Sequence, residues 1–352
     1  MEYENYYTYQ EIKRQPKTWQ RIFDSIVIKK DYDRKIFEKK YDEIVLFGCG
    51  SSYNLSQSCS FFTKSLLNNS ANAIPSSEIL INPDIFINKQ KKYLFIGFSR
   101  SGETTESVEV IKILKNLKNV TIFTFTCNAS SSFSKLSSFS FTCSDSLEKS
   151  IVMTESFSSM LIAYCLIVST LIKDRKLLES FRYLIEYLDE KMPYITEFAE
   201  RYINQNKFKS YFTLGSGFNY GLSVEADLKM KEMSQIPSYS YHLYEFNHGP
   251  KSLLNNESLC LILTIDEKMK KHKELLKEFN SLGAHILIVS DKKINNIGRE
   301  RIEYFLIEKS FCNNMVKSFI NIPVFQNLAF FKTIKNNLNP DLPANLSYSV
   351  KI

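Results

Sequence analysis

The stretch FSRSGETTESVEV, residues 98–110, joins a buried strand to a helix through a loop rich in hydroxyl groups. The apolar run at 93–98 predicts the strand, because a continuous apolar segment of this length is typical of a strand buried on both faces. Apolar residues then recur at every third position from Val108 to Leu117, which predicts an amphipathic helix. Between the two, Gly102 lacks a Cβ and lets the backbone approach a ligand closely.

The loop between this strand and this helix has the composition of an anion site. Serine and threonine hydroxyls, a guanidinium and the N–H groups of a helix start are donors that suit a phosphate. The candidate phosphate-binding residues are Ser99, Arg100, Ser101 and Thr104. A hydroxyl-rich loop before a helix is also an ordinary helix cap, and the loop alone favours that simpler interpretation. The rest of the chain shifts the balance towards a ligand site.

Strands and helices alternate along most of the chain. Apolar strands are predicted at 42–50, 93–98, 120–126, 139–143, 211–214, 259–266, 284–291 and 302–308. Continuous apolar strands separated by helices are typical of a parallel sheet covered on both faces. The pattern occurs twice, because 47–54 matches 213–220 and 93–99 matches 259–265, both at an offset of about 166 residues. The sequence therefore predicts an α/β fold of two tandem domains, each a mainly parallel sheet flanked by helices.

The expected boundaries are 1–40 for an N-terminal helical segment, 41–175 for the first domain, 176–205 for a helical connector, and 206–352 for the second domain with a C-terminal tail. A sparse apolar stripe in the N-terminal segment predicts that it packs on the body of the protein. The second copy has DEKMKKH (266–272) where the first has SRSGETT. Only the first domain is therefore expected to hold a phosphate.

Composition limits the classes of protein to which the chain can belong. Its 352 residues, 44% hydrophobic and 24% charged, are typical of a soluble globular protein with room for two domains. The apolar window at 160–172 is too short to span a bilayer, and the charged N-terminus predicts no secretory signal, so a cytoplasmic location is expected. The net charge of +7 is spread over lysine clusters interrupted by acidic residues, which favours neither a nucleic acid nor a membrane partner. Seven isolated cysteines predict buried thiols and no metal site.

Six motifs resemble the sugar isomerase (SIS) domain family, which includes the isomerase half of glucosamine-6-phosphate synthase and stand-alone phosphosugar isomerases, deaminases and deglycases. They are GCGSSYN (48–54), SRSGETTES (99–107), IVMTESF (151–157), LKMKEMS (228–234), EFNHGPKS (245–252) and NPDLPANLS (339–347). Their order and spacing match the family from about residue 40 to the C-terminus. The resemblance implies paired α/β domains, with a sugar phosphate at the strand ends of the first.

The resemblance also implies roles for individual residues. The phosphate is expected on the loop residues named above, with Arg100 acting through its side chain or its backbone. Further contacts to phosphate or sugar are expected from Ser51 and Ser52, and a sugar lining from Val152, Met153 and Thr154. Glu232 is expected to move the proton between C1 and C2, and His248 of a neighbouring subunit is expected to assist ring opening. A homodimer with shared sites is therefore implied, and neither a metal nor a cofactor is expected.

The residue pattern itself gives partial support to these catalytic candidates. Glu225, Lys229 and Glu232 share one face of a predicted helix, although the helix alone favours an exposed salt-bridged face. His248 lies in a Gly-Pro turn without an obvious packing role, which leaves structural and functional interpretations even. One carboxylate, one imidazole and donors for an enediolate oxygen suffice for aldose–ketose interconversion.

One position departs from the family. The family's synthase has a C-terminal lysine that forms a Schiff base with the keto sugar, and Tyr348 stands there in this chain, so an imine would need Lys351 or Lys229 instead. We predict an isomerase of a hexose or hexosamine 6-phosphate, with Lys229 and Tyr348 as further site residues. An amino-sugar 6-phosphate deaminase or fructosamine 6-phosphate deglycase uses the same enolisation. A non-catalytic sugar-phosphate sensor is the alternative from another class.

Overall fold

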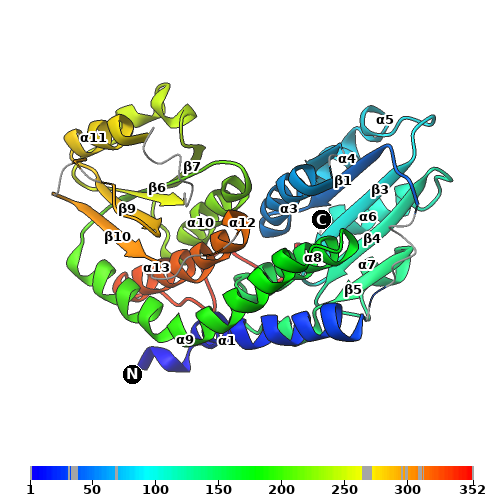
Figure 1. Ribbon diagram of the computed structural model, residues 1–352, viewed down its shortest axis with the longest axis horizontal. Coiled ribbons are helices and arrows are strands. Elements are labelled where there is room, and N and C mark those ends of the chain that lie inside the picture. The colour runs from blue at the N-terminus through cyan, green and yellow to red at the C-terminus, as the bar shows by residue number, and fades with distance from the viewer. Residues whose placement is uncertain are drawn as a thin grey trace.

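The computed structural model describes residues 2–30, 32, 39–67, 70–263, 272–294, 296–297, 300–307, 311 and 313–350. It contains two five-stranded parallel sheets that lie side by side in Figure 1. Their strand orders are β2-β1-β3-β4-β5 and β7-β6-β8-β9-β10. The predicted α/β fold is confirmed, and the equal strand orders support the internal duplication.

The first sheet consists of β1 (Glu43–Gly48), β2 (Ala71–Pro75), β3 (Tyr93–Ser99), β4 (Val120–Thr126) and β5 (Phe139–Thr142). Its connections contain α3 (Ser51–Leu67), α4 (Ser76–Ile81), α5 (Pro83–Phe86), α6 (Thr105–Leu114) and α7 (Ser132–Leu136). Every residue of β3 is buried, as its unbroken apolar run predicted. The edge strand β2 was missed, because only its first residue is buried and it has no continuous apolar run.

The second sheet consists of β6 (Ser210–Gly215), β7 (Ser238–His242), β8 (Ser258–Leu263), β9 (His285–Ser290) and β10 (Ile302–Leu306). Its main helices are α10 (Phe218–Ser234), α11 (Lys273–Ser281), α12 (Asn314–Lys317) and α13 (Asn321–Lys335). The edge strand β7 was also missed, because most of its residues are partly or fully exposed. The segment 266–271, which replaces the phosphate loop in this copy, lies outside the described residues.

Helices α1 (Tyr7–Phe23), α8 (Glu155–Leu171) and α9 (Arg175–Gln205) lie with α13 beneath the two sheets (Figure 1). One hydrophobic core includes side chains of all four helices and of strands from both sheets. Trp19 and Ile26 of the N-terminal segment are fully buried in it, so the apolar stripe packs on the body as predicted. The long helix α9 links the two halves of the chain.

The described helices include none long and apolar enough to cross a membrane. The six cysteines among the described residues are free, and five of them are buried. Cys312 lies outside the described residues.

Strand order determines where the first sheet can hold a ligand. The chain runs from β1 outwards to β2, then crosses back to β3 on the other side of β1. In open parallel sheets of this order, a crevice forms beyond the carboxyl ends of the two strands at the point where the direction reverses. That position lies beyond β1 and β3, where the sequence placed Ser51 and the phosphate loop.

Candidate active site

The loops that follow β1 and β3 meet at the carboxyl edge of the first sheet. The two strands pair in parallel from Glu43 opposite Tyr93 to Phe47 opposite Gly97. The hydroxyl of Ser107, in the first turn of α6, lies 3.5 Å from the thiol of Cys49 and 3.0 Å from the hydroxyl of Ser76. The starts of α3, α4 and α6 therefore converge, and the positive ends of their dipoles favour an anion there.

We define residues 99–104 as the phosphate cradle. Gly102 has a φ of +65°, and a Cβ at this position would lie 2.2 Å from Ser131 Oγ, so the turn requires glycine. Ser99 Oγ accepts a hydrogen bond of 3.1 Å from the Gly102 N–H and so shapes the turn from inside. Ser101 and Thr104 are half-buried, and Thr104 occupies the N-cap position of α6 without a side-chain capping bond. The Thr104 hydroxyl therefore does not cap α6, whereas Ser101 Oγ accepts a hydrogen bond from the Glu103 N–H at 3.1 Å within the loop.

The Arg100 side chain points into the protein and is 5% exposed. Its guanidinium donates to Glu148 Oε2 at 3.1 Å and to the Ile151 carbonyl at 2.7 Å. Further hydrogen bonds reach the carbonyls of Ser150 at 3.3 Å and Tyr348 at 3.1 Å. Arg100 therefore fastens the cradle to two other segments, and this geometry gives no support to the expectation that its guanidinium contacts the phosphate.

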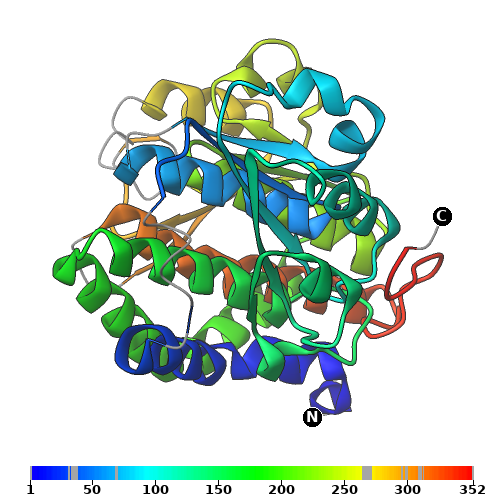
Figure 2. The ribbon, with the colours of Figure 1, turned by 90° about the vertical axis from the view of Figure 1, so that its right-hand side faces the viewer.

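The C-terminal strap, residues 339–350, reaches the cradle after passing the N-terminus of α1. The Ser101 hydroxyl donates to Ser349 Oγ at 3.3 Å, and the Thr105 N–H donates to the Val350 carbonyl at 3.4 Å. The Tyr348 ring packs on the Arg100 guanidinium at 4.0 Å. The strap, coloured red in Figure 2, thus occupies polar groups of the cradle and of the start of α6.

Tyr348 differs from a Schiff-base lysine in its chemistry and in its surroundings. Its hydroxyl is buried and has no hydrogen-bond partner among the described residues. Burial raises the pKa of Tyr348 to about 12, although the Arg100 charge acts in the opposite direction. The phenol therefore remains protonated at neutral pH and is a hydrogen-bond donor.

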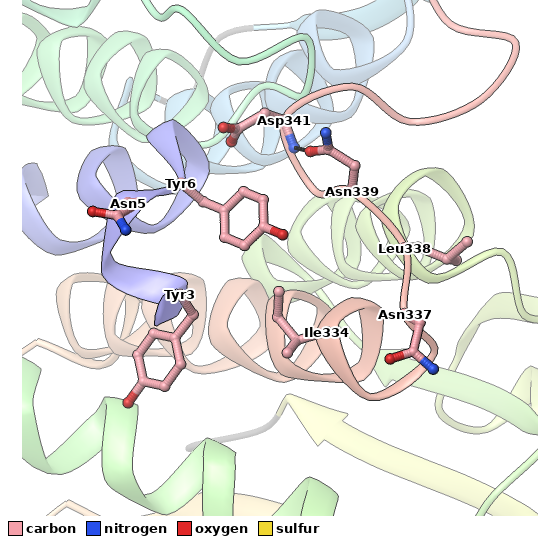
Figure 3. A pocket seen from close by; sticks show the side chains of 8 residues that line it. All are labelled: Tyr3, Asn5, Tyr6, Ile334, Asn337, Leu338, Asn339 and Asp341. Carbon is pink, nitrogen blue, oxygen red and sulfur yellow. Dashed lines mark hydrogen bonds between the residues drawn. The ribbon is translucent and has the colours of Figure 1, made fainter. Parts of the chain in front are cut away.

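A surface groove of about 1100 Å³ lies at the base of the strap (Figure 3). Two tyrosines, three asparagines, Ile334, Leu338 and Asp341 line it, so the lining has no lysine or arginine. Asp341 accepts hydrogen bonds from the N–H groups of Tyr7 and Thr8 at 2.9 and 2.8 Å. These bonds anchor the strap to α1. The lining does not suit a phosphate, and none of the predicted site residues belongs to it.

A buried ionic cluster joins the two domains beside α3. Lys229 of α10 is fully buried, and its Nζ lies 2.5 Å from Glu232 Oε2 and 3.3 Å from Glu225 Oε1. The same ammonium donates to Ser51 Oγ at 3.3 Å, across 178 positions of sequence. Asn54, on the same helix as Ser51, donates to Glu225 Oε2 at 2.9 Å. The three residues share one helix face as predicted, but this face is an interface between domains, in which Glu225 and Lys229 are buried and Glu232 is partly exposed.

The members of this cluster differ in burial and charge. Burial raises the pKa of Glu225 to about 7, even though the Lys229 charge opposes the shift. Burial alone would lower the pKa of Lys229, but Glu225 and Glu232 together raise it, so the ammonium stays charged. Glu232 has a side chain that is 21% exposed. It is therefore the carboxylate of the cluster that a ligand can reach.

The segment expected to line the sugar lies at the start of α8. Val152 and Thr154 are buried and Met153 is half-buried. The N–H and hydroxyl of Thr154 donate to Glu148 Oε1 at 2.6 and 2.9 Å. Sequence analysis did not identify Glu148 as a site residue. The only feature that could have pointed to it is its position three residues before the motif at 151–157. Asn54 was likewise missed, although it belongs to the motif at 48–54.

His248 lies in the second domain, between the short helices η4 (Glu245–Asn247) and η5 (Pro250–Leu253). Its side chain is exposed. Among the described residues, the hydrogen bonds and ion pairs of Lys229 go to Ser51, Glu225 and Glu232, and none goes to His248. The exposed position leaves it available to a second chain, as the family resemblance implies.

Comparison with known proteins agrees with the paired α/β fold. The sequence model of the SIS domain matches residues 35–170 and 206–326. Glutamine–fructose-6-phosphate aminotransferase (isomerizing) of Haemophilus influenzae is 26% identical over 328 residues, which cover 89% of this chain and 52% of that protein. The chain thus spans about half the length of the curated relatives it matches.

Two solved structures show the same fold over nearly the whole chain. Glucosamine-6-phosphate deaminase of Thermotoga maritima has a TM-score of 0.79 and 26% identity, covering 98% of this chain and 99% of its own. Tagatose-6-phosphate ketose/aldose isomerase of Escherichia coli has a TM-score of 0.87 and 20% identity, covering 97% and 96%.

Proposed function

Because this chain belongs to the SIS domain family, we propose that it interconverts the aldose and ketose forms of a hexose or hexosamine 6-phosphate. The observation that carries the proposal is the cluster of Ser51, Lys229 and Glu232 between the two domains. It offers a reachable carboxylate that can act as a general base, beside a buried cation that can stabilise developing negative charge. An enolisation needs both groups.

In this proposal the substrate binds by its phosphate in the crevice beyond β1 and β3. Ser101, Thr104 and the N-terminus of α6 hold the phosphate, while Ser51 and Ser52 contact phosphate or sugar hydroxyls. Val152, Met153 and Thr154 line the sugar. Phosphate binding at a distance from the reacting carbons contributes binding energy that positions C1 and C2 against the base.

The proton moves between adjacent carbons through an enediol. Glu232 takes the proton from C2 of the open-chain aldose and returns it to C1 while the hydroxyl proton of O2 passes to O1, which gives the ketose, and the reverse direction uses the same carboxyl. The Lys229 ammonium, 2.5 Å from Glu232, stabilises the negative charge that develops on the enediolate oxygen. His248 from a second subunit opens the sugar ring before this step. Tyr348, which belongs to the strap, contributes a protonated phenol.

The test of the base is deuterium exchange with Glu232→Gln. Incubation of hexose and hexosamine 6-phosphates in D₂O, followed by NMR, should show solvent deuterium at C1 or C2 with the wild-type protein. The substitution should slow this exchange by roughly 10²- to 10⁴-fold, because it removes a positioned general base and keeps the side-chain shape. Asp227→Asn is a matched control, since Asp227 is an acid of the same helix that pairs with Lys231. Exchange that persists unchanged in Glu232→Gln contradicts the assignment.

The deaminase alternative draws on the likeness to the Thermotoga maritima protein. Release of ammonia from glucosamine 6-phosphate, together with deuterium exchange, would favour it over the isomerase. A sensor would bind a sugar phosphate without exchange by any variant. The three functions therefore give three different results with one set of substrates.

A further inference from the structure

We propose that Glu148 is a positioning residue, whose buried carboxylate holds the phosphate cradle and the sugar-lining segment in a fixed relation. The proposal rests on the function proposed above, because that function gives ligand roles to both segments. Glu148 itself is buried, so it acts on a ligand only through the residues that it holds.

The Glu148 carboxylate accepts hydrogen bonds from five donor groups. Oε1 accepts from the Thr154 N–H at 2.6 Å, the Thr154 hydroxyl at 2.9 Å and the Ser156 N–H at 3.1 Å. Oε2 accepts from Arg100 Nη1 at 3.1 Å and from the Ser156 hydroxyl. One carboxylate thus binds the first turn of α8 and the cradle at the same time, and the positive end of the α8 dipole adds to its stabilisation.

Arg100 transmits this constraint to the cradle, since it lies between Ser99 and Ser101. Its carbonyl accepts hydrogen bonds from the Cys127 N–H at 3.1 Å and the Thr126 hydroxyl at 3.3 Å, so its backbone is tied to β4. Its guanidinium also donates to the Ile151 carbonyl, next to the sugar-lining residues. Without Glu148, the buried guanidinium would lose its counter-ion and both segments would lose their common support.

Glu11 of α1 supports the same segment from the other side. Its carboxylate accepts hydrogen bonds from the Lys149 N–H at 2.7 Å, the Ser150 N–H at 3.4 Å and the Ser150 hydroxyl. Burial, and then the negative charge of Glu148, raise the pKa of Glu11 to about 7. Two carboxylates that repel each other are thus kept close, and the hydrogen bonds from the segment between them offset part of the cost.

Glu155 provides the matched control, because it is an equally buried carboxylate at the start of α8. It accepts hydrogen bonds from Arg14 Nε at 2.6 Å and the Thr18 hydroxyl at 2.6 Å, both in α1. These partners tie α8 to α1 and belong neither to the cradle nor to the sugar-lining segment. A purely structural role predicts that Glu148→Gln and Glu155→Gln behave alike.

The experiment measures the affinity of the full-length variants for inorganic phosphate and for glucitol 6-phosphate, a linear sugar phosphate that cannot isomerise, by titration calorimetry. We expect Glu148→Gln to weaken glucitol 6-phosphate binding by roughly tenfold or more. The substitution removes the charge that accepts hydrogen bonds from Arg100 and Thr154, so the two ligand-binding segments lose their common support. The loss for inorganic phosphate should be smaller, because the phosphate does not reach the sugar-lining segment. Glu155→Gln should lower the melting temperature and leave both affinities at their wild-type values.

A gentler pair of variants covers the case in which Glu148→Gln does not fold. Ser156→Ala removes one donor to Glu148, whereas Ser158→Ala removes a hydroxyl that bonds Trp19 and the Glu155 carbonyl. Both serines are fully buried in α8. Ser156→Ala should weaken the binding of glucitol 6-phosphate several-fold, because about one hydrogen bond to Glu148 is lost. Ser158→Ala should leave this affinity unchanged.

The outcomes separate this proposal from the function on which it rests. Equal glucitol 6-phosphate affinities in the wild type, Glu148→Gln and Ser156→Ala would overturn the positioning role, as would parallel losses in the Glu155 and Ser158 controls. A wild-type protein that binds the probe but exchanges no deuterium refutes the isomerase and leaves this test intact. A wild-type protein that does not bind glucitol 6-phosphate overturns both.

Discussion

The neighbours of Lys229 determine that this buried side chain keeps its charge. Burial opposes its charge, and two carboxylates with a serine hydroxyl compensate for the lost water. Glu225 is fully buried and Glu232 is partly exposed, so the same helix face presents one carboxylate to the interior and one to solvent. Two carboxyl groups in different environments can take different roles.

The pKa of Glu225 leads to a prediction about stability. Its folded value of about 7 lies above the ordinary value of 4.5, so the folded chain binds more protons than the unfolded chain between these pH values. The contribution of Glu225 to the free energy of unfolding is therefore largest below about pH 4.5, falls as pH rises towards 7, and is constant above. Glu225→Gln should gain stability relative to the wild type across this window, on the order of 3 kcal/mol in total. Denaturation at pH 5 and pH 8 measures the difference, and an equal difference at both values would contradict the shift.

The cradle gives a second prediction at this scale. Changing Ser101 and Thr104 together to alanine should weaken inorganic phosphate binding by several-fold to a few hundred-fold, because two hydrogen bonds to a charged group are lost. Ser130→Ala is a suitable control, since Ser130 is an exposed serine of a neighbouring loop. Calorimetric titration with phosphate is the measurement, and an unchanged dissociation constant would show that the two hydroxyls only support the turn.

Helices α3 and α10 make the closest approach between the two domains. A Cβ on Gly221 would lie 2.3 Å from Ser58 Oγ and 2.6 Å from the Asn54 carbonyl oxygen. The Ser58 hydroxyl also donates to the Phe218 carbonyl at 2.9 Å. A glycine in one helix therefore lets the two backbones approach, and this approach places Ser51 against Lys229.

Gly221→Ala tests this close packing. Alanine gains about 1 kcal/mol of helix propensity over glycine, but overpacking a tight contact costs about 1–3 kcal/mol, and here one obstacle is backbone. We expect a net destabilisation and a drop in turnover, because α10 must move away from Ser51. Lys231→Arg, at an exposed position of the same helix, keeps a cation beside Asp227 and should change the free energy of unfolding by less than about 0.5 kcal/mol. A variant as stable and active as the wild type would refute the packing argument.

Exposed apolar side chains flank His248 in the sequence of the second domain. Tyr239, Tyr244 and Leu253 are 39%, 51% and 51% exposed, and His242 stacks on Tyr220 with a centroid distance of 3.6 Å. Large exposed apolar side chains near a candidate catalytic residue favour a protein interface. We propose that a second copy of the chain covers these side chains and receives His248.

Mixing two inactive variants tests the shared site. In a two-fold dimer of Glu232→Gln with His248→Ala, one site combines the intact Glu232 of one chain with the intact His248 of the other. Free exchange of subunits makes half of the dimers mixed, so activity should return to about a quarter of the wild-type value. Each variant alone serves as the control. Recovery that stays at zero while mixed dimers are present would place His248 and Glu232 in the same chain.

The sequence by itself determined the main elements and their order. Interior strands such as β3 and β8 are buried at every residue, so their continuous apolar runs predicted them from the sequence alone. The common face of Glu225, Lys229 and Glu232 followed from helical periodicity. The edge strands β2 and β7 were not predicted, because they are partly exposed to solvent and therefore lack a continuous apolar run.

Only the tertiary structure decided which partners the polar residues have. Arg100 turned inwards to Glu148 instead of outwards to an anion, and Lys229 met Ser51 across 178 positions. The exposed salt-bridged face that the α10 pattern favoured became a buried junction, because α3 covers it. Local sequence sets the direction of a side chain on its helix or strand, whereas its burial and its partners depend on contacts between distant segments, which exist only once the domains have packed together.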